Sequence, residues 1–352
     1  MEASELISCY EKGIERSMNE DLLIEILARL PLKSLSRFKC VSKSWYRLIS
    51  DKYLQQKLPL ISTGVFFRSE SDQFKEPRYA YTADDGVIED SQLDFFPFHE
   101  KSTIVDGCNG LLLYYRPAPV TFYVVNTTTK KWVSLPRPQK ITQLSILAFD
   151  PYSSPDFNVL CFTAWRAQGA DLEIYSSETG KWDQHEIQFG IETDAISATM
   201  HYFNNVLYIL AYPNLVVAVN LAKISCNLIK LPEPMNRDGR VGHSQGHLHY
   251  AYIDENKLKI WMLKDAKRSE WALKHETSVR HFIGTREIKP NILAFHPEKE
   301  LVYIWVPWKM VSYNLRERRS EGVWKFDKER GKAYLIQIWL FPCSSFLTKC
   351  LA

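Results

Sequence analysis

The chain has 352 residues, of which 45% are hydrophobic and 24% are charged, and its formal net charge is +3. This is the composition of a globular protein with room for two or three domains. So small a net charge gives no support to nucleic-acid binding. The apolar stretch 335–347 is short and interrupted by Gln337 and Pro342, which excludes a membrane-spanning helix there.

Seven cysteines are scattered along the chain without a Cys-x-x-Cys pair. An odd and dispersed set is typical of reduced thiols. Residues 1–17 are polar and mixed in charge, unlike a secretion signal. We therefore expect a cytoplasmic or nuclear protein, and we expect residues 1–16 to be disordered or loosely ordered.

Three short amphipathic helices are predicted between residues 17 and 58. Leu22, Ile26 and Leu30 recur at every fourth position within a wide apolar stripe, and Pro31 ends this first helix. Two shorter amphipathic stretches follow, at 34–41 and 44–49. So small a unit seldom buries enough apolar surface to fold alone. An exposed apolar face usually marks a partner site, so we expect this end of the chain to dock onto another protein.

The sequence LARLPLKSLSRFKCVSKSWYRLIS at 27–50 resembles the F-box of plant F-box proteins, as part of one ungapped block over 18–58. One departure is Met18-Asn19, where the family has Leu-Pro. The resemblance implies that residues 17–58 are a three-helix F-box that docks on a Skp-type adaptor and, through it, on a cullin–RING ubiquitin ligase.

We assign a set of apolar residues of this module as adaptor contacts, although some of them must instead pack within the module. The assigned contacts are Met18, Leu22, Ile26, Leu30, Pro31, Leu32, Leu35, Val41, Trp45 and Ile49.

Beyond residue 61 the helical period disappears, and short runs rich in β-branched and aromatic residues alternate with polar turns. Each unit has one strand followed by a hairpin whose second strand opens with a Trp or a substitute. Trp132, Trp182 and Trp271 mark this position, and the repeat interval is about 42–50 residues where it can be measured. That period predicts four-stranded propeller blades, because a blade has two apolar faces that only neighbouring blades can bury.

Five segments of this region resemble the F-box-associated domain of plant F-box proteins, which is related to kelch propellers. They are GCNGLLLYY (107–115), VVNTTTKKWVSLP (124–136), LAFDP (147–151), IYSSETGKW (174–182) and HSQGHLHYAY (243–252). We therefore predict a multidomain α plus all-β protein whose residues 61–352 form a kelch-like propeller. We expect about six blades, with 335–350 supplying a strand that closes the ring. An open β-sandwich is the alternative.

Kelch-like rings bind ligands on the rim built from the loops between second and third strands and the loops that join blades. In this register the substrate contacts are Arg116, Trp165, Arg166, Asn214, Arg240, Arg286, Trp308 and Lys309. Trp and Arg are typical of binding hot spots, and several arginines on one face favour an acidic or phosphorylated peptide. Trp165 and Trp308 are the strongest candidates, since a large aromatic in a predicted loop is hard to explain by core packing.

No catalytic or metal-binding pattern is found. His243, His247 and His249 could suggest zinc, but the last two alternate along a predicted strand and no cysteine or carboxylate is suitably near in sequence. The sequence has no GxSxG, P-loop, GxGxxG or HExxH motif. We predict no metal, no cofactor and no catalytic residue.

These observations lead to one functional hypothesis and one alternative. The first is the substrate-recognition subunit of an SCF-type ubiquitin ligase, with the F-box on a Skp-type adaptor and cullin and the β domain on an unidentified protein target. The alternative is a non-degradative F-box scaffold whose ring binds a protein complex or a small ligand. Neither hypothesis involves nucleic acid or a membrane.

Overall fold

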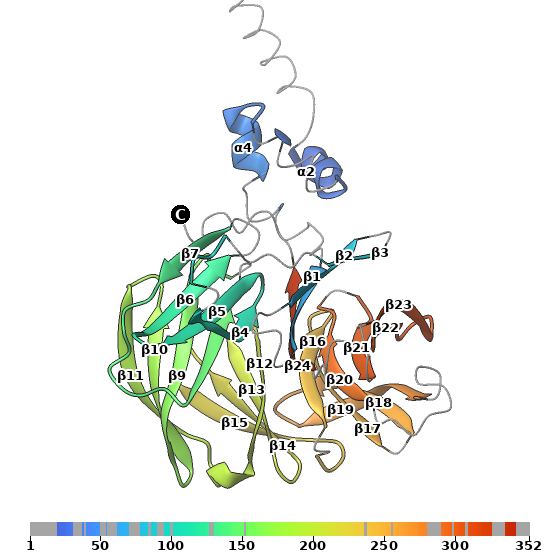
Figure 1. The fold of residues 1–352 in the computed structure, drawn as a ribbon. Coiled ribbons are helices and arrows are strands. Elements are labelled where there is room, and N and C mark those ends of the chain that lie inside the picture. The colour runs from blue at the N-terminus through green and yellow to red at the C-terminus, as the bar shows by residue number, and fades with distance from the viewer. Residues whose placement is uncertain are drawn as a thin grey trace, which may run out of the picture. The chain divides into compact units, whose positions relative to one another are not determined.

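The computed structural model divides into two compact units, a helical unit within residues 1–60 and a β unit within 61–343 (Figure 1). Each unit is described by itself. The residues that the structure describes are 20–30, 37–38, 40–49, 54, 62–69, 78–83, 86–89, 95–98, 101–126, 130–150, 153–235, 238–254, 256–279, 290–297, 299–306, 309–325 and 335–342.

The helical unit contains helices α2 (Glu20–Ala28) and α4 (Lys43–Ile49). The N–H of Trp45 donates to Ser42 Oγ at 3.2 Å, so Ser42 caps the start of α4. Phe38 packs edge-on against Trp45, with ring centroids 5.3 Å apart. The predicted middle helix at 34–41 lies largely outside the described residues. No helix in the described ranges is long and apolar enough to cross a membrane.

The core of the helical unit consists of buried Ile24, Leu27, Ile49 and Leu54. On α2, Ile24 and Leu27 lie on this inner side because a spacing of three residues returns to the same helical face. Ile49 is fully buried, so our assignment of Ile49 as an adaptor contact is wrong: the side chain is used by the module's own core.

The strands of the described chain form six four-stranded antiparallel sheets (Figure 1). The first three are β4 (Thr103–Cys108), β5 (Leu111–Pro117), β6 (Val120–Asn126) and β7 (Lys131–Ser134); β8 (Leu144–Phe149), β9 (Phe157–Arg166), β10 (Gly169–Ser176) and β11 (Lys181–Gln188); and β12 (Ile196–Phe203), β13 (Val206–Ala211), β14 (Leu215–Asn220) and β15 (Ser225–Lys230). The others are β16 (Arg240–Ser244), β17 (His247–Asp254), β18 (Lys257–Asp265) and β19 (Glu270–Ser278); β20 (Asn291–Phe295), β21 (Leu301–Val306), β22 (Lys309–Asn314) and β23 (Arg319–Lys325); and β24 (Leu335–Pro342), β1 (Ser62–Ser69), β2 (Arg78–Ala83) and β3 (Gly86–Glu89).

The six sheets contact one another through their innermost strands, which are β4, β8, β12, β16, β20 and β24, and the series of contacts closes. Strand β4 contacts β8, and contacts continue through β12, β16 and β20 to β24, which contacts β4 again. Strand β24 also pairs with β1, so the two ends of the β unit share one sheet, with Leu340 opposite Val65. The expected closing strand in 335–350 is therefore present. A closed series also rules out the open β-sandwich that we kept as an alternative.

Both faces of the inner strands are buried, as strand β5 demonstrates, whereas the outer strands β7, β11 and β15 are largely exposed. Its alternating residues Leu111 and Leu113 pack in the core between the first and second sheets. The intervening Leu112 and Tyr114 pack with Phe96 in a different core on the other side. Alternation along a strand sends neighbouring side chains to opposite faces, so every residue from Leu111 to Tyr114 is apolar and buried.

The repeated tryptophans join consecutive sheets. Trp182 on β11 donates its indole N–H to the carbonyl of Pro136, which follows β7 of the preceding sheet, at 2.8 Å. Trp271 on β19 makes the same bond to the carbonyl of Lys230, on β15 of the preceding sheet, also at 2.8 Å. At two of the three repeat positions, the tryptophan thus makes a hydrogen bond between neighbouring sheets.

Replacing Trp182 or Trp271 with Phe removes this bond and leaves a carbonyl without its donor. Both acceptor residues are exposed, so water can replace the lost donor, and we expect each change to lower the free energy of unfolding by about 0.5–1.5 kcal/mol, measured by urea denaturation. Trp132→Phe is the matched control, because the indole of Trp132 makes ring contacts with Phe96 and Phe98 instead. A Trp132→Phe loss as large as the other two would contradict the hydrogen bond's role.

Candidate functional site: two interaction surfaces

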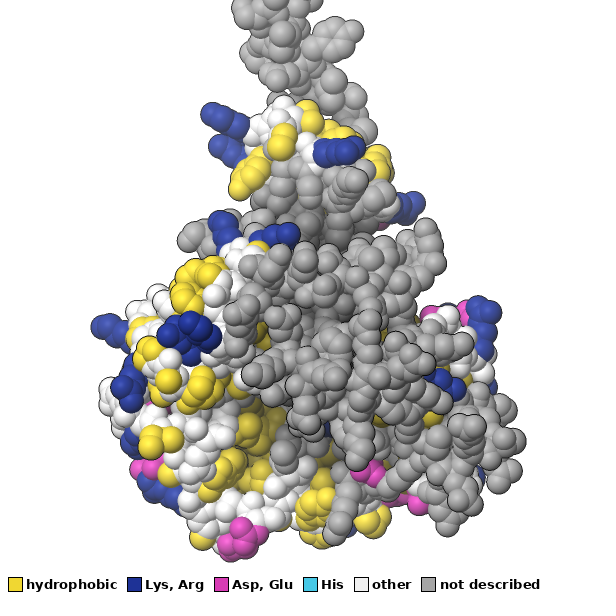
Figure 2. All heavy atoms as spheres, in the orientation of Figure 1, with side chains coloured by type: hydrophobic (Ala, Val, Ile, Leu, Met, Phe, Trp, Pro, Cys, Tyr) yellow, Lys and Arg dark blue, Asp and Glu magenta, His cyan; other side chains and the backbone are white. Residues whose placement is uncertain are grey.

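The helical unit exposes apolar side chains on the side away from its core. Leu22 is 59%, Ile26 49% and Val41 64% exposed, and Tyr46 is also exposed. Leu22 and Ile26 are four residues apart and share one face of α2. Figure 2 shows hydrophobic side chains on this unit beside Lys and Arg. This arrangement is suited to protein binding, since large exposed apolar patches in soluble proteins mark interaction sites.

The structure divides the assigned adaptor contacts into three groups. Leu22, Ile26 and Val41 are exposed. Leu30 and Trp45 are partly buried against the core of the helical unit, and Ile49 belongs to that core. The remaining four, Met18, Pro31, Leu32 and Leu35, lie outside the described residues.

Tyr46 is an exposed aromatic that the sequence reasoning missed. Trp45 and Ile49 are four residues apart on α4 and both face the core. Their spacing places Tyr46 on a different face of the short helix, and this was a signal that the sequence contained.

The second surface is one end of the β unit, which we call the rim. It carries the loops between the second and third strands of each sheet and the loops from one sheet to the next. Because strands in an antiparallel sheet alternate in direction, these two sets of loops emerge at the same end. The described rim segments within residues 101–240 are 116–119, 135–143, 167–168, 189–195, 212–214, 231–235 and 238–239.

Two of the assigned rim arginines are engaged by their own sheets. Arg116 donates through Nε to the carbonyl of Ala118 at 3.2 Å and through Nη1 to Tyr123 Oη at 3.3 Å. Arg166 lies 2.7 Å from Asp171 and 2.9 Å from Glu186. The hydrogen bond to Glu186 and the charge of Asp171 raise the pKa of Arg166. The positive charge of Arg166 is therefore already balanced.

Trp165 is a packing residue and not the free loop aromatic that we expected. It lies within β9 and stacks on Phe162, with ring centroids 5.0 Å apart and planes 8° from parallel. It also contacts Phe189 and packs against the core between the second and third sheets. The sequence reasoning failed because it ended the strand at Ala164 instead of Arg166.

The other assigned rim residues give less information. Asn214 accepts a hydrogen bond through its backbone carbonyl from Leu231 N at 2.8 Å, which holds the turn before β14. Lys309 is the first residue of β22. Arg286 and Trp308 lie outside the described residues.

Two exposed apolar residues on the rim escaped the sequence reasoning. Ile141 is 88% exposed in the loop between β7 and β8, and Tyr212 is exposed in the turn between β13 and β14. The Ile141 loop is held by the fully buried carboxylate of Glu173, which accepts the backbone N–H of Gln139 at 2.9 Å and of Lys140 at 3.4 Å. A lone isoleucine in the polar run PRPQKITQ was the available signal.

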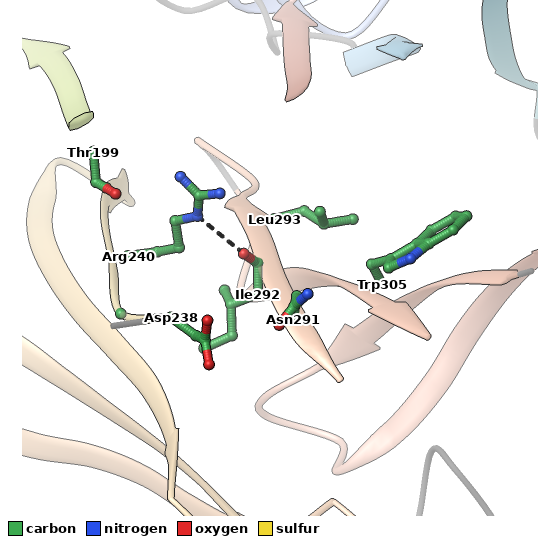
Figure 3. A pocket seen from close by; sticks show the side chains of 8 residues that line it. Thr199, Asp238, Arg240, Asn291, Ile292, Leu293 and Trp305 are labelled. Atoms are coloured by element: carbon green, nitrogen blue, oxygen red, sulfur yellow. Dashed lines mark hydrogen bonds between the residues drawn. The ribbon is translucent and has the colours of Figure 1, made fainter. Parts of the chain in front are cut away.

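The remaining assigned arginine, Arg240, lines a pocket of about 130 Å³ (Figure 3). Its Nε donates to the carbonyl of Ile292 at 3.2 Å. Burial lowers the pKa of Arg240, and the charge of Asp238 opposes that shift. The pocket is lined by Thr199, Asp238, Gly239, Arg240, Asn291, Ile292, Leu293 and Trp305.

Two of the histidines considered for zinc, His243 and His249, take part in packing between sheets, whereas His247 is exposed. His243 Nδ1 lies 2.8 Å from Nε2 of His201, which joins β16 to β12, and Phe203 stacks on His243 at 4.4 Å. His249 Nδ1 bonds the carbonyl of His247 at 3.0 Å. Within the described residues, no group of three possible ligands is placed to hold a metal ion.

The buried histidine pair predicts acid-sensitive folding. Burial lowers the pKa of His201 to about 3 and of His243 to about 4. The unfolded chain, with its ordinary histidine pKa of about 6.5, therefore binds more protons below that pH. The two histidines therefore leave the free energy of unfolding at its full value above a pH of about 6.5. They lower it as the pH falls from there toward their pKa values in the folded protein. Each histidine can change the free energy of unfolding by at most about 1.4 kcal/mol per pH unit.

We expect His201→Gln/His243→Gln to unfold with a weaker dependence on pH between about 7 and 5 than the original protein, measured by denaturant titration at each pH. Other histidines with pKa lowered by burial, His249, His275 and His296, remain and keep part of the dependence. His247→Gln, at an exposed position outside the pair, is the control. Equal profiles for all three proteins would contradict the role of the pair.

Comparison with known families agrees with this architecture. A model of the F-box domain matches residues 16–57. A model described as "F-box protein At3g26010-like, beta-propeller" matches residues 91–339, more than half of the chain. A helical F-box followed by a closed set of four-stranded sheets defines an F-box protein with a C-terminal β-propeller. The chain belongs to the At3g26010-like β-propeller family of F-box proteins. Neither matching model describes an enzyme family.

Its relatives include F-box proteins of Arabidopsis thaliana, similar over most of their length. F-box protein At5g07610 is 26% identical, over 87% of this chain and 85% of the relative. F-box protein At5g49610 is also 26% identical, over 87% of this chain and 89% of the relative. F-box protein At3g26010 is 25% identical, over 95% of this chain and 86% of the relative.

Proposed function

We propose that this protein is the substrate-recognition subunit of an SCF-type cullin–RING ubiquitin ligase. The F-box binds a Skp-type adaptor and, through it, a cullin. The six sheets are six blades of one kelch-like propeller, and its rim recruits a protein target. This role requires a cytoplasmic or nuclear location.

The observation that carries the proposal is the set of exposed apolar side chains on the F-box, which are Leu22, Ile26, Val41 and Tyr46. Burying four such side chains contributes at most about 6–12 kcal/mol in gross terms, at about 1.5–3 kcal/mol each for full burial, because each is already partly covered in the free module. Association costs about 4–15 kcal/mol in lost translational and rotational freedom. The described face is therefore near the threshold for stable docking, so the adaptor must also contact residues beyond these four. Met18, Pro31, Leu32 and Leu35 are our candidates.

The protein needs no active site for this role. Binding a target on the rim and an adaptor on the F-box raises the effective concentration of the target's lysines near a charged ubiquitin-conjugating enzyme. Its contribution is then positioning, and the chemistry belongs to the other subunits.

The test uses the full chain and purified Skp-type adaptors. We expect Leu22→Asp/Ile26→Asp to weaken adaptor binding about 100-fold or more, because two buried apolar contacts are replaced by desolvated charges. Both positions are exposed, so the thermal unfolding midpoint should not change. Calorimetric titration measures the affinity. Wild-type binding by this variant, or no binding by the original protein to any adaptor tested, would refute the ligase assignment.

The rim has a complementary prediction. Ile141→Asp/Tyr212→Ala should retain adaptor affinity and reduce ubiquitination of captured targets in a reconstituted reaction, because a rim contact is lost while the F-box face is intact. Undiminished ubiquitination would remove these residues from the target site. Target binding without any ubiquitination would favour a non-degradative scaffold.

A further inference from the structure

We propose that the Arg240 pocket receives one Asp or Glu side chain of the protein that the rim recruits. This inference rests on the proposed function of the rim as a protein-binding surface. It adds the chemical class of the group that the target presents.

The pocket is a composite of three neighbouring sheets at the rim end. Arg240 and Asn291 are the first residues of strands β16 and β20, and Thr199 lies on β12. Its volume of about 130 Å³ corresponds to roughly four water molecules in the liquid. That space suits one short side chain and is too small for a folded segment.

The guanidinium of Arg240 is held in place, and its terminal nitrogens have no direct ion-pair partner in the described part of the chain. Its Nε donates to the carbonyl of Ile292 at 3.2 Å, and Figure 3 shows its two terminal nitrogens directed away from that carbonyl. Among the described residues, no carboxylate forms an ion pair with Arg240. With Nε engaged, the terminal nitrogens still form a planar fork that matches the two oxygens of a carboxylate.

Arg166 on the same rim shows what a satisfied arginine looks like in this protein. Asp171 and Glu186 lie 2.7 and 2.9 Å from its terminal nitrogen. Arg166 therefore offers little to an incoming anion, whereas Arg240 retains its terminal donors. Asp238 acts on Arg240 through its charge but makes no direct ion pair with it. A partly buried cation without a direct ion-pair partner is costly, and an acidic side chain from the target would offset that cost.

The charges around the pocket favour a carboxylate over a phosphate. Asp238 also lines the pocket, and its charge acts on Arg240. Phosphorylated groups are typically recognised by clusters of arginines, whereas Arg240 is the single cation in this lining and Asp238 is an anion beside it. Ile292 and Leu293 supply apolar lining for the methylene groups of an Asp or Glu side chain.

The test selects peptides from a random displayed library on the full chain. We expect the enriched peptides to share an Asp or Glu at one position, and a change of that residue to Asn or Gln to weaken binding about tenfold or more. Arg240→Gln should weaken binding of the acidic peptide to a similar extent. It should not weaken binding of the amide peptide further, because the change in the protein and the change in the peptide remove the same contact. Arg166→Gln is the matched control and should leave both affinities unchanged.

Arg240→Gln also removes the hydrogen bond to the carbonyl of Ile292, so a second variant that keeps this bond is needed. Asn291 is exposed, and Asn291→Asp places a carboxylate of the protein's own beside Arg240. We expect this variant to weaken the acidic peptide about tenfold with an unchanged unfolding midpoint.

Several results would overturn the proposal: no enriched peptides, enriched peptides without a shared acid, or Arg240→Gln weakening acidic and amide peptides equally. Tighter binding when phosphoserine replaces the acid would assign the pocket to phosphate instead. Adaptor affinity is measured on the same variants. Loss of adaptor binding with acid-specific peptide binding intact would refute the ligase role and leave the pocket assignment standing.

Discussion

A four-stranded sheet with two apolar faces cannot stand alone in water, and this constraint governs the β unit. Strand β21 is buried at all of its residues from Leu301 to Val306. Exposing either face of such a strand costs about 1.5–3 kcal/mol for each large apolar side chain. Each sheet must therefore be covered on both sides, and the series of six sheets meets this condition by closing through β24 and β1. The indole hydrogen bonds of Trp182 and Trp271 add direction to an otherwise non-directional packing force.

The closed packing also determines where binding groups can lie. Side chains within the inner strands are mostly used for the cores between sheets, as Trp165 illustrates by stacking on Phe162. Groups available for a partner are left to the rim, where Ile141 is presented by a loop anchored on Glu173 and Arg240 begins an inner strand. The small helical unit divides its apolar residues in the same way. Ile24 and Leu27 form its core, and Leu22 and Ile26 face outward.

The sequence predicted the parts of this structure that depend on local periodicity. The alternation of apolar residues located the strands, and the recurring Trp located the sheets. It also predicted that Arg240 lies on the rim. Burial of individual residues was less predictable, because it depends on contacts distant in sequence. Ile49 was assigned to the adaptor because it belongs to the apolar stripe of a short helix. Such a stripe is wider than the part that packs inside the module, and the sequence does not separate the two. Arg166 was indistinguishable from Arg240, since only folding brings Asp171 and Glu186 to one of them.

The central claim is that adaptor and target use separate surfaces on two separate units. Amide hydrogen exchange of the full chain, with and without a purified Skp-type adaptor, tests it most directly. Our account predicts slower exchange within residues 20–49 when the adaptor binds and unchanged exchange in the strands and rim loops of 103–325. Protection of the rim loops by the adaptor, or no protection within 20–49, would contradict it.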